Sequence, residues 1–213
     1  MIQIDDSGSG SLIGGTCIGL YHTDTKKYYY GIIPVEYYNK KNFSRKKYLD
    51  CAVDIVQEGF EALSVNKNDP IEVCQGYMFD KLRTWLTDHQ YQWDSTHIIG
   101  DLQDSVENTF EQYAVSLGFP DQYVKYTKYP FHFHRILRWV YADYENRIKH
   151  CKVGWKSWQK YGRLKTDISI ETMPNKHYSC LKCGKTLEPN TDVKVLRFIS
   201  NKPNIIYLHL QCE

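Results

Sequence analysis

Two close pairs of metal-binding residues stand near the C-terminal end of the 213-residue chain. Two residues separate Cys180 from Cys183, two separate His209 from Cys212, and 25 separate the pairs from each other. Zinc in structural sites takes four nitrogen and sulfur ligands in a tetrahedron, and a two-residue spacer lets each pair occupy one edge. No fifth ligand or adjacent acid suggests catalysis at this site. We therefore expect a closed, structural site that holds about one zinc ion per chain.

A second set of residues could bind a harder cation. Asp5 and Asp6 end an expected first strand, and Asp101 ends a later one. Carboxylates that meet at a sheet edge form an oxygen cage suited to Mg²⁺ or Mn²⁺. Two such ions, roughly 3.5–4 Å apart, could activate water and stabilise the leaving oxygen of a phosphodiester. We expect Asp5, Asp6 and Asp101 to be catalytic, with magnesium or manganese bound to Asp5 and Asp101.

Two features beside these acids have a second interpretation. Asp104 is a further catalytic candidate, but the spacing of Asp104 and Glu107 also fits a capping box at the start of a helix. Gly8 and Gly10 would let backbone N–H groups approach a phosphate or a sugar hydroxyl, which makes them substrate-binding candidates. The alternative for this loop is a surface turn, because Asp, Ser and Gly all favour turns.

Charge is unevenly distributed along the chain. Residues 1–124 carry 10 Lys and Arg against 18 Asp and Glu, whereas residues 125–165 carry 11 against 2. Cations that neutralise phosphates, beside aromatic rings that stack on bases, are suited to single-stranded or splayed nucleic acid. The alternative is a core-packing helix over residues 136–148 with a solvated basic face. We expect nucleic-acid contacts from Arg135, Arg138, Lys152, Trp155, Lys156, Trp158 and Lys160.

Several other chemically capable residues have structural interpretations. His132 and His134 alternate with Phe131 and Phe133 along the chain. A pair of histidines without a further ligand is more often structural than catalytic or metal-binding. The remaining cysteines stand singly within apparent strands and helices, which predicts buried free thiols. They are Cys17, Cys51, Cys74 and Cys151.

The elements that must position the acids follow from hydrophobic periodicity. Three expected strands, joined by short turns, form an antiparallel meander. Helices then alternate with two more strands, which implies a mixed sheet with helices on its faces. The strands are expected at 1–6, 16–21, 28–35, 71–74 and 96–100, and the helices at 44–63, 78–89 and 106–117.

The first strand and its loop resemble the corresponding motif of type 2 ribonucleases H. Asp5, Gly8, Gly10, Leu12 and Gly14 match the family motif in position. The family has a glutamate where this chain has Asp6, a basic residue where it has Ser9, and a proline where it has Ser11. The resemblance covers about a dozen residues, and element order extends it to residue 118. It implies a ribonuclease-H-like fold, with Asp101 placed as the family's third acid.

The order of the zinc-binding residues is also similar to that of known modules. Two cysteines followed by a histidine and a cysteine resemble zinc fingers of the poly(ADP-ribose) polymerase type and half of a LIM domain. Those modules bind DNA breaks and proteins respectively, so the resemblance allows either nucleic acid or a protein as the partner of the zinc module. A hairpin over residues 193–199 and 205–208 is expected to bring the second ligand pair back to the first.

These patterns together predict an α/β protein with three parts: a ribonuclease-H-like domain at 1–124, a basic aromatic helical segment at 125–170 and a zinc module at 171–213. The expected function is a metal-dependent nuclease; the alternative is a non-catalytic adaptor for nucleic acid or protein on the same fold. A small phosphorylated substrate has no support beyond the glycine loop, which is neither a P-loop nor a dinucleotide fingerprint. The chain shows no apolar run that could span a membrane, and its first residues lack the features of a signal peptide, so a cytoplasmic location is expected.

Overall fold

The computed structural model describes residues 1–176 and 178–212. The chain forms two compact units. The first unit contains Met1–Gly118 together with Lys152–Trp155, and the second contains Phe119–Cys151 and Lys156–Glu213. Lys152–Trp155, a four-residue piece of the basic segment expected at 125–170, packs within the first unit, and the rest of that segment belongs to the second unit together with residues 171–213.

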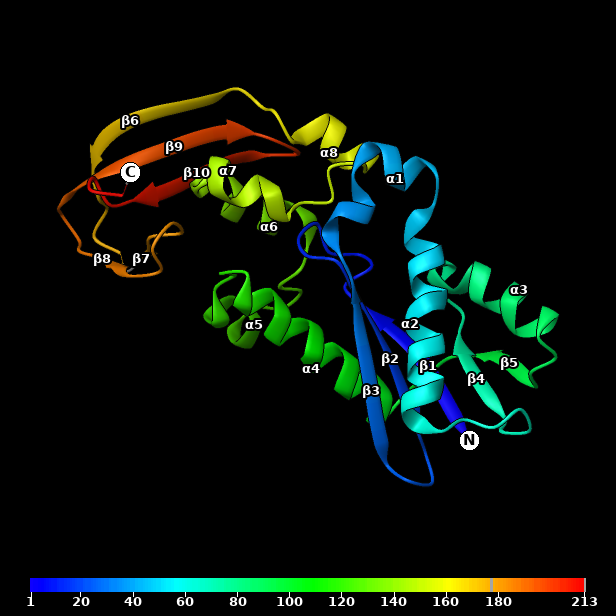
Figure 1. The fold of residues 1–213 in the computed structure, drawn as a ribbon. Coiled ribbons are helices and arrows are strands. Elements are labelled where there is room, and N and C mark those ends of the chain that lie inside the picture. The colour runs from blue at the N-terminus through cyan, green and yellow to red at the C-terminus, as the bar shows by residue number, and fades with distance from the viewer. Residues whose placement is uncertain (177, 213) are drawn as a thin grey trace. The chain divides into compact units, whose positions relative to one another are not determined.

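A mixed five-stranded sheet forms the centre of the first unit (Figure 1). Its strand order is β3-β2-β1-β4-β5. β2 runs antiparallel to both β1 and β3, whereas β4 and β5 run parallel to β1. The α/β class and the mixed sheet are confirmed. The strands are β1 (Ile2–Ser7), β2 (Thr16–His22), β3 (Lys27–Ile33), β4 (Ile71–Cys74) and β5 (Trp93–Thr96).

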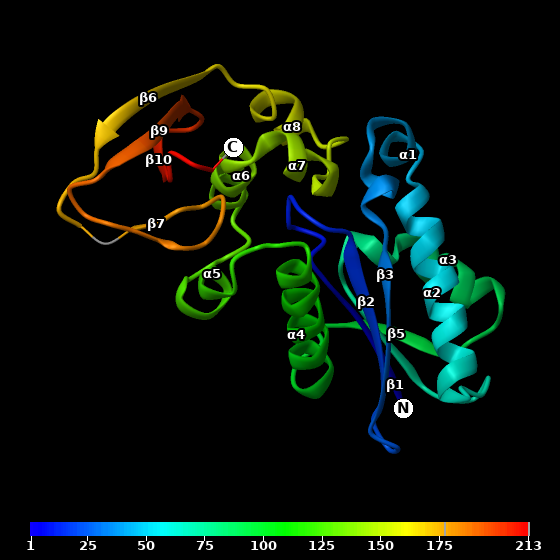
Figure 2. The same cartoon turned by 60° about the vertical axis from the view of Figure 1, so that its left-hand side comes forward.

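Helices cover both faces of this sheet (Figure 2). Neighbouring residues of a strand point to opposite faces, and β2 shows which helix lies on which side. A Cβ at Gly19 would meet Leu102 and Val106 of α4, whereas Leu20 contacts Gly59 of α2. The helical elements of this unit are η1 (Val35–Tyr38), α1 (Lys40–Ser44), α2 (Lys47–Leu63), η2 (Tyr77–Phe79), α3 (Asp80–Asp88) and α4 (Asp101–Ser116).

The larger core lies between the sheet and α2, where alternate strand residues meet the apolar stripe of the helix. Ile2, Ile4, Ile18 and Leu20 point into it from the strands and are fully buried. On the helix, Ala52, Val56 and Phe60 recur at intervals of four residues, which places them on one face. The core therefore fixes β1, and with it the position of the acids at its C-terminal end.

The strand expected at 96–100 and the helix expected at 106–117 have other boundaries in the structure. The strand expected at 96–100 lies earlier, at Trp93–Thr96, so Asp101 does not end a strand. Asp101 instead begins α4, whose cap position is Gly100 with a positive φ of 87°. Glycine tolerates that conformation at little cost, and the helix can start five residues before the apolar periodicity at Val106 suggested.

The second unit combines short helices with a three-stranded antiparallel sheet of order β10-β9-β6. The expected hairpin is confirmed as β9 (Asp192–Ile199) and β10 (Pro203–Leu208). The single helix considered over 136–148 is broken at Asp143, whose φ and ψ of −156° and 64° are not helical. The other elements are α5 (Asp121–Tyr126), α6 (Phe133–Ala142), α7 (Tyr144–Arg147), η3 (Ile148–His150), α8 (Lys156–Tyr161), β6 (Thr166–Thr172), β7 (Tyr178–Ser179) and β8 (Thr186–Leu187).

Among the helices that the structure describes, none combines the length and the apolar character needed to cross a bilayer.

Candidate functional site

The four expected zinc ligands converge in the second unit. Their ligand atoms all lie within 4.8 Å of one another. The Sγ atoms of Cys180 and Cys212 are 3.9 Å apart, and Nδ1 of His209 lies 3.3 Å from Sγ of Cys183 and 3.9 Å from Sγ of Cys212. A tetrahedral zinc ion with Zn–S of about 2.3 Å and Zn–N of about 2.0 Å has ligand-to-ligand edges of roughly 3.5–3.8 Å. The group could therefore hold a metal ion such as zinc.

Local backbone structure sets each ligand pair. The amide of Gly184 donates to the carbonyl of Cys180 over 2.8 Å, and the amide of Cys180 donates to the carbonyl of Lys185 over 2.9 Å. Gly184 closes this turn with a φ of 76°, a conformation that glycine adopts without strain. The second pair follows β10, where the amide of Cys212 donates to the carbonyl of His209. Hairpin and turn thus bring the pairs together.

The imidazole of His209 has a fixed tautomer. Its Nε2 lies 3.1 Å from the carbonyl oxygen of Thr186, which can only accept a hydrogen bond. Nε2 therefore carries the hydrogen, and Nδ1 presents a lone pair toward the cysteines. A second hydrogen bond of this kind is what orients most metal-binding histidines.

The thiol of Cys180 is poised to ionise. Burial alone would raise its pKa, but the backbone N–H groups of Cys183, His209 and Lys182 together lower the pKa to about 7. A thiolate is the form of cysteine that binds metal. The turn therefore favours the metal-binding form of Cys180.

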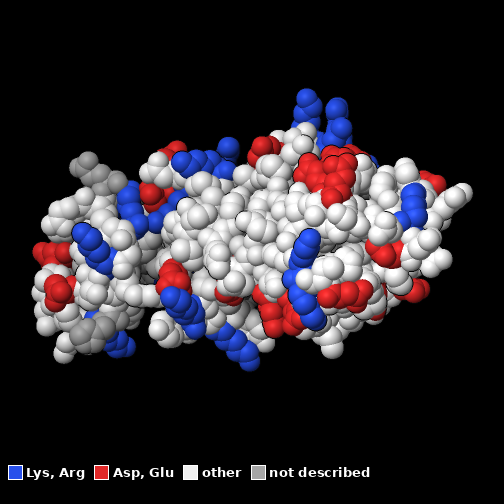
Figure 3. All heavy atoms as spheres, turned by 60° about the horizontal axis from the view of Figure 1, so that its bottom comes forward, with Lys and Arg blue, Asp and Glu red and all other residues white. Residues whose placement is uncertain are grey.

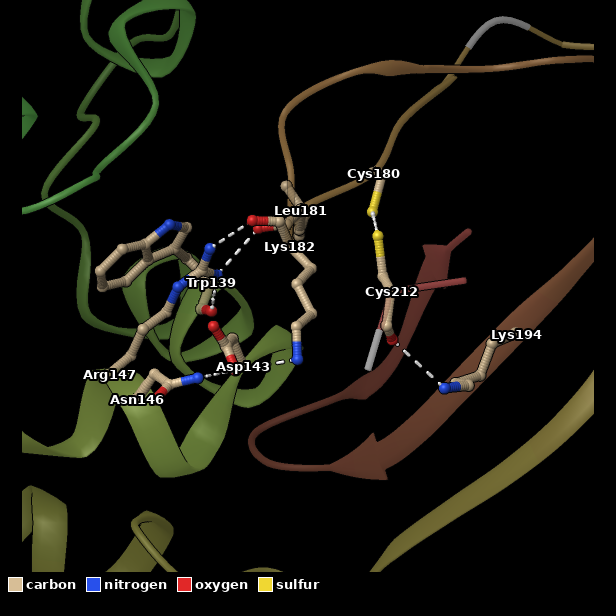
Figure 4. Close-up of polar contacts among 9 residues, drawn as sticks. All are labelled: Trp139, Asp143, Asn146, Arg147, Cys180, Leu181, Lys182, Lys194 and Cys212. Atoms are coloured by element: carbon tan, nitrogen blue, oxygen red, sulfur yellow. Dashed lines mark hydrogen bonds and ion pairs between the residues drawn. The ribbon is translucent and has the colours of Figure 1, made fainter. Parts of the chain in front are cut away.

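Arg147 donates hydrogen bonds to the backbone between the first two ligands (Figure 4). Its guanidinium donates to the carbonyls of Leu181 and Lys182, each over 2.8 Å, and to the carbonyl of Trp139 over 2.6 Å. Leu181 and Lys182 are the two residues between Cys180 and Cys183. The side chain is 8% exposed, so these hydrogen bonds are shielded from water. Sequence reasoning did not find this role, because nothing in the pattern around Arg147 distinguishes it from its basic neighbours.

The acidic candidates at the end of β1 point to opposite faces of the sheet. Gly19, the partner of Asp5 in the β1–β2 register, faces α4. Asp6 faces the other side, where its Oδ1 lies near Gly76 and its charge acts on Tyr38. Because the pair is split by the alternation of the strand, the two side chains do not form one chelating group.

Asp5 belongs to a polar cluster on the α4 side. It is 8% exposed. Burial, with a contribution from the charge of Glu107, raises the pKa of Asp5 above its ordinary value. A hydrogen bond from Cys74 and the charge of His97 act in the opposite direction. A helix acid therefore does act on Asp5, but it is Glu107, which the sequence suggested as part of a cap.

Asp6 shares its side of the sheet with a buried cation. Burial raises the pKa of Asp6 to about 6, against hydrogen bonds from Ser9 and the positive charge of Lys152. Its Oδ2 is buried and has no hydrogen-bond partner among the residues that the structure describes. Oδ2 of Asp6 is therefore an acceptor that could bind a cation or a hydrogen-bond donor.

Lys152 is fully buried within the first unit. Its Nζ donates to the carbonyl of Gly8 over 2.6 Å, approaches Oγ1 of Thr16 at 3.4 Å, and lies 4.4 Å from the ring centre of Tyr38. Burial lowers the pKa of Lys152 to about 7, although the charge of Asp6 opposes the shift. The prediction that Lys152 contacts nucleic acid is therefore wrong, because the side chain is withdrawn into the fold.

Asp101 and Asp104 do not join Asp5. The carboxylate of Asp101 accepts a hydrogen bond from Tyr21 over 3.0 Å and lies 3.7 Å from Nζ of Lys26. Asp104 lies in the first turn of α4 and provides no side-chain cap, so the capping interpretation is not met either. Among residues 1–176 and 178–212, the four-residue Cys/His group is the only set of three or more His, Cys, Asp or Glu whose ligand atoms converge.

The glycines of the first loop have different roles. Gly8 has a φ of 83°, and a Cβ there would lie 2.1 Å from the ring of Phe110. The fold therefore demands glycine at this position, and its carbonyl accepts the hydrogen bond from Lys152. A Cβ at Gly10 would meet nothing within 4 Å, and the residue is exposed. Only Gly10 is free to approach a ligand.

The expected nucleic-acid residues separate into exposed and buried ones. Lys156 and Lys160 are exposed on α8, and Arg135 and Arg138 are half-buried on α6. Trp158 is 7% exposed and contacts Gly162, so it packs in the fold and is not available for stacking on a base. The basic stretch is thus part core and part surface.

Trp155 belongs to the first unit, where its half-buried ring lies 5.1 Å from Nζ of Lys152. On the face drawn in Figure 3, Lys and Arg side chains stand singly or in small groups among acidic and uncharged ones. That face carries no continuous basic surface.

No protein-family model matches the chain, and no match is found among curated proteins. The functional argument therefore rests on the geometry of the sites.

Proposed function

We propose that the first unit is a ribonuclease-H-like domain and that the chain is a Mg²⁺- or Mn²⁺-dependent nuclease with a structural zinc module. The strand order and directions of the five-stranded sheet support the fold, as does the first-strand motif around Asp5. The observation that carries the function is the buried carboxylate of Asp5 at the C-terminal end of the central strand, under the influence of Glu107.

The proposed ion site differs from the one that the sequence suggested. Asp5 and Glu107, whose charge acts on Asp5, would supply two oxygen ligands, and water and substrate would complete the shell, because no third protein ligand atom converges with them among the described residues. Hard oxygen donors suit Mg²⁺ and Mn²⁺. When bound, the ion would activate water and stabilise charge on a phosphodiester. One ion is proposed in place of two, because Asp6 lies on the other face of the sheet and Asp101 is engaged by Tyr21 and Lys26.

The two other parts of the proposal have separate supports. Nucleic acid would bind through the exposed or half-buried cations Arg135, Arg138, Lys156 and Lys160, which can neutralise phosphates. The cluster of Cys180, Cys183, His209 and Cys212 would hold one zinc ion for stability, since all four tetrahedral positions are taken by protein ligands.

A non-catalytic adaptor for nucleic acid or protein is the second candidate. One observation favours it: β4 ends at the same sheet edge as β1 but contributes the thiol of Cys74, not a carboxylate. A chain without a carboxylate on this strand would keep the fold but lack a complete set of acids for phosphodiester cleavage.

Cleavage assays separate the two candidates. Single-stranded, duplex and hybrid substrates would be incubated with the zinc-loaded chain and either Mg²⁺ or Mn²⁺. The nuclease proposal predicts cleavage that Asp5→Asn and Glu107→Gln abolish while nucleic-acid affinity is retained. Asp104→Asn is the matched control, because it removes an acid from the same helix, and it should leave cleavage intact. If the wild-type chain binds nucleic acid but cleaves none of these substrates, the adaptor is correct.

A further inference from the structure

A cavity of about 380 Å³ lies within the second unit, between the α5–α6 region and the turn that joins β9 to β10. No carboxylate lines it among the residues that the structure describes. Its volume is in the range of small-ligand sites. The lining residues are Tyr123, Thr127, His132, His134, Arg135, Arg138, Asn201, Lys202 and Asn204.

Three basic side chains line this cavity with much of their hydrogen-bonding capacity unused. Arg135 and Arg138 each donate one hydrogen bond to a backbone carbonyl, over 3.0 Å and 2.8 Å respectively. Lys202 is exposed on the β9–β10 turn. A guanidinium has five N–H donors in a planar fork that matches phosphate and carboxylate groups. The cavity is therefore rich in donors for which the described residues provide no acceptor.

Two buried atoms of the same cavity lining also lack partners. Nε of Arg138 and Nδ1 of His134 are shielded from solvent, and neither has a hydrogen-bond partner in the described part of the chain. Burial, followed by the charges of His132, Lys202 and Lys160, lowers the pKa of His134. Unsatisfied buried polar atoms cost free energy, and an anion bound in the cavity would offset the excess positive charge of its lining.

We propose that this cavity is a binding site for a terminal phosphate group carried by a nucleotide, either a mononucleotide or the phosphorylated end of a nucleic-acid strand. A terminal phosphate carries close to two negative charges at neutral pH and three acceptor oxygens. Three cations without a neighbouring acid match that charge better than the single charge of an internal phosphodiester. Arg135, Arg138 and Lys202 would bind the phosphate oxygens.

The size and remaining lining of the cavity favour a nucleotide over inorganic phosphate alone. A lone phosphate would leave most of the volume empty, whereas a sugar and base could occupy it. Tyr123 offers an aromatic ring on which a base can stack, and Asn201 offers an amide that can donate and accept hydrogen bonds. The site shares Arg135 and Arg138 with the proposed nucleic-acid contacts, but it does not depend on the nuclease activity, because no acid or metal contributes to it.

Fluorescence polarisation without Mg²⁺ or Mn²⁺ tests the proposal, since it measures binding in the absence of cleavage. Short labelled strands of one sequence would carry a 5′-phosphate, a 3′-phosphate or hydroxyls at both ends, with a mononucleotide and inorganic phosphate as competitors. We expect one phosphorylated strand or the mononucleotide to bind about tenfold more tightly than its unphosphorylated counterpart. Which of them does so identifies the natural source of the phosphate.

Two variants and a control make the assignment specific. Lys202→Ala removes an exposed cation at the cavity and should abolish the preference for phosphate without disturbing the fold. Arg138→Gln should do the same, and far-ultraviolet circular dichroism would check that it is folded. Lys176→Ala removes an exposed lysine of the same unit that does not line the cavity, and it should keep the preference.

Equal affinity for phosphorylated and unphosphorylated ligands would overturn the proposal, as would an unchanged preference in Lys202→Ala and Arg138→Gln. Binding of a phosphoserine peptide in place of the nucleotides would overturn the ligand class, since the cavity would then serve protein recognition.

Discussion

The zinc cluster and the acid edge of β1 both contain closely spaced candidate metal ligands but differ in how these are brought together. In the cluster, two residues separate the ligands of each pair, so a local turn can place both of them. At the β1 edge, Asp5 and Asp6 are adjacent, and the alternation of the strand sends them to opposite faces. Close spacing therefore creates a site only where the local backbone turns both side chains toward one point.

The surroundings of the two sites differ as well. Arg147 and Thr186 hold the cluster by hydrogen bonds to its backbone and to His209. Around the acids, burial and the cation Lys152 act on Asp6, while Glu107 acts on Asp5. The ligand atoms of the Cys/His cluster converge on one point. The two acids of β1 lie on opposite faces of the sheet, and the face of Asp6 also contains Lys152.

Removal of a zinc ligand should have the largest effect. Binding of structural zinc contributes on the order of 10 kcal/mol to folding, so Cys183→Ser should lose the metal and unfold the cluster region. Elemental analysis would measure the zinc, and hydrogen exchange would measure the protection of β9 and β10. Cys51→Ser is the control, because Cys51 lies in α2, outside the cluster. A variant that stays free of zinc with full protection in both strands would contradict a structural role.

Replacement of Arg147 should have the next largest effect. Arg147→Leu removes the guanidinium donor from three carbonyls, two of them buried, and releases the turn between Cys180 and Cys183. Loss of such supporting residues lowers metal affinity roughly 10- to 100-fold, which competition with a chromogenic chelator would measure. Arg163→Leu removes an exposed arginine of the same unit and should retain the affinity. An equal loss in both variants would show that Arg147 does not act through the turn.

Lys152 should produce a smaller, pH-dependent effect. Its pKa is about 7 in the folded chain, below the unfolded value of roughly 10.4. Between these values the unfolded chain binds more protons, so the free energy of unfolding should rise with pH, on the order of 1 kcal/mol per pH unit. The rise should be absent below pH 7, where both states are protonated.

Lys152→Met removes this titration. Urea unfolding of both proteins at several pH values would give the difference between them, which cancels the other titrating groups. A difference that stays constant from pH 7 to pH 10 would show that Lys152 remains charged in the folded chain.

The sequence supports prediction of features set by neighbouring residues. The hairpin of β9 and β10, the strand β4 and the zinc ligands all follow from short-range patterns. Asp101 was misplaced because the apolar run around Ile98 lies in the connection between β5 and α4, where Gly100 starts the helix early. The burial of Lys152 arises from a contact with Gly8, 144 positions away, and composition gives no sign of it.

The role of Glu107 also depends on tertiary structure that the sequence pattern does not give. Its spacing from Asp104 suggested a cap, whereas its place on the sheet-facing helix α4 brings its charge to Asp5. Which helical acid approaches a strand depends on the rotation of that helix about its axis. That rotation is set by packing of Leu102 and Val106 over Gly19, a tertiary contact.

Manganese binding measured by electron paramagnetic resonance on the zinc-loaded chain tests the central claim most directly. The proposal predicts about one Mn²⁺ per chain, lost in both Asp5→Asn and Glu107→Gln and retained in Asp101→Asn. Binding that survives Glu107→Gln but disappears in Asp101→Asn would contradict the account, as would a wild-type chain that binds no Mn²⁺.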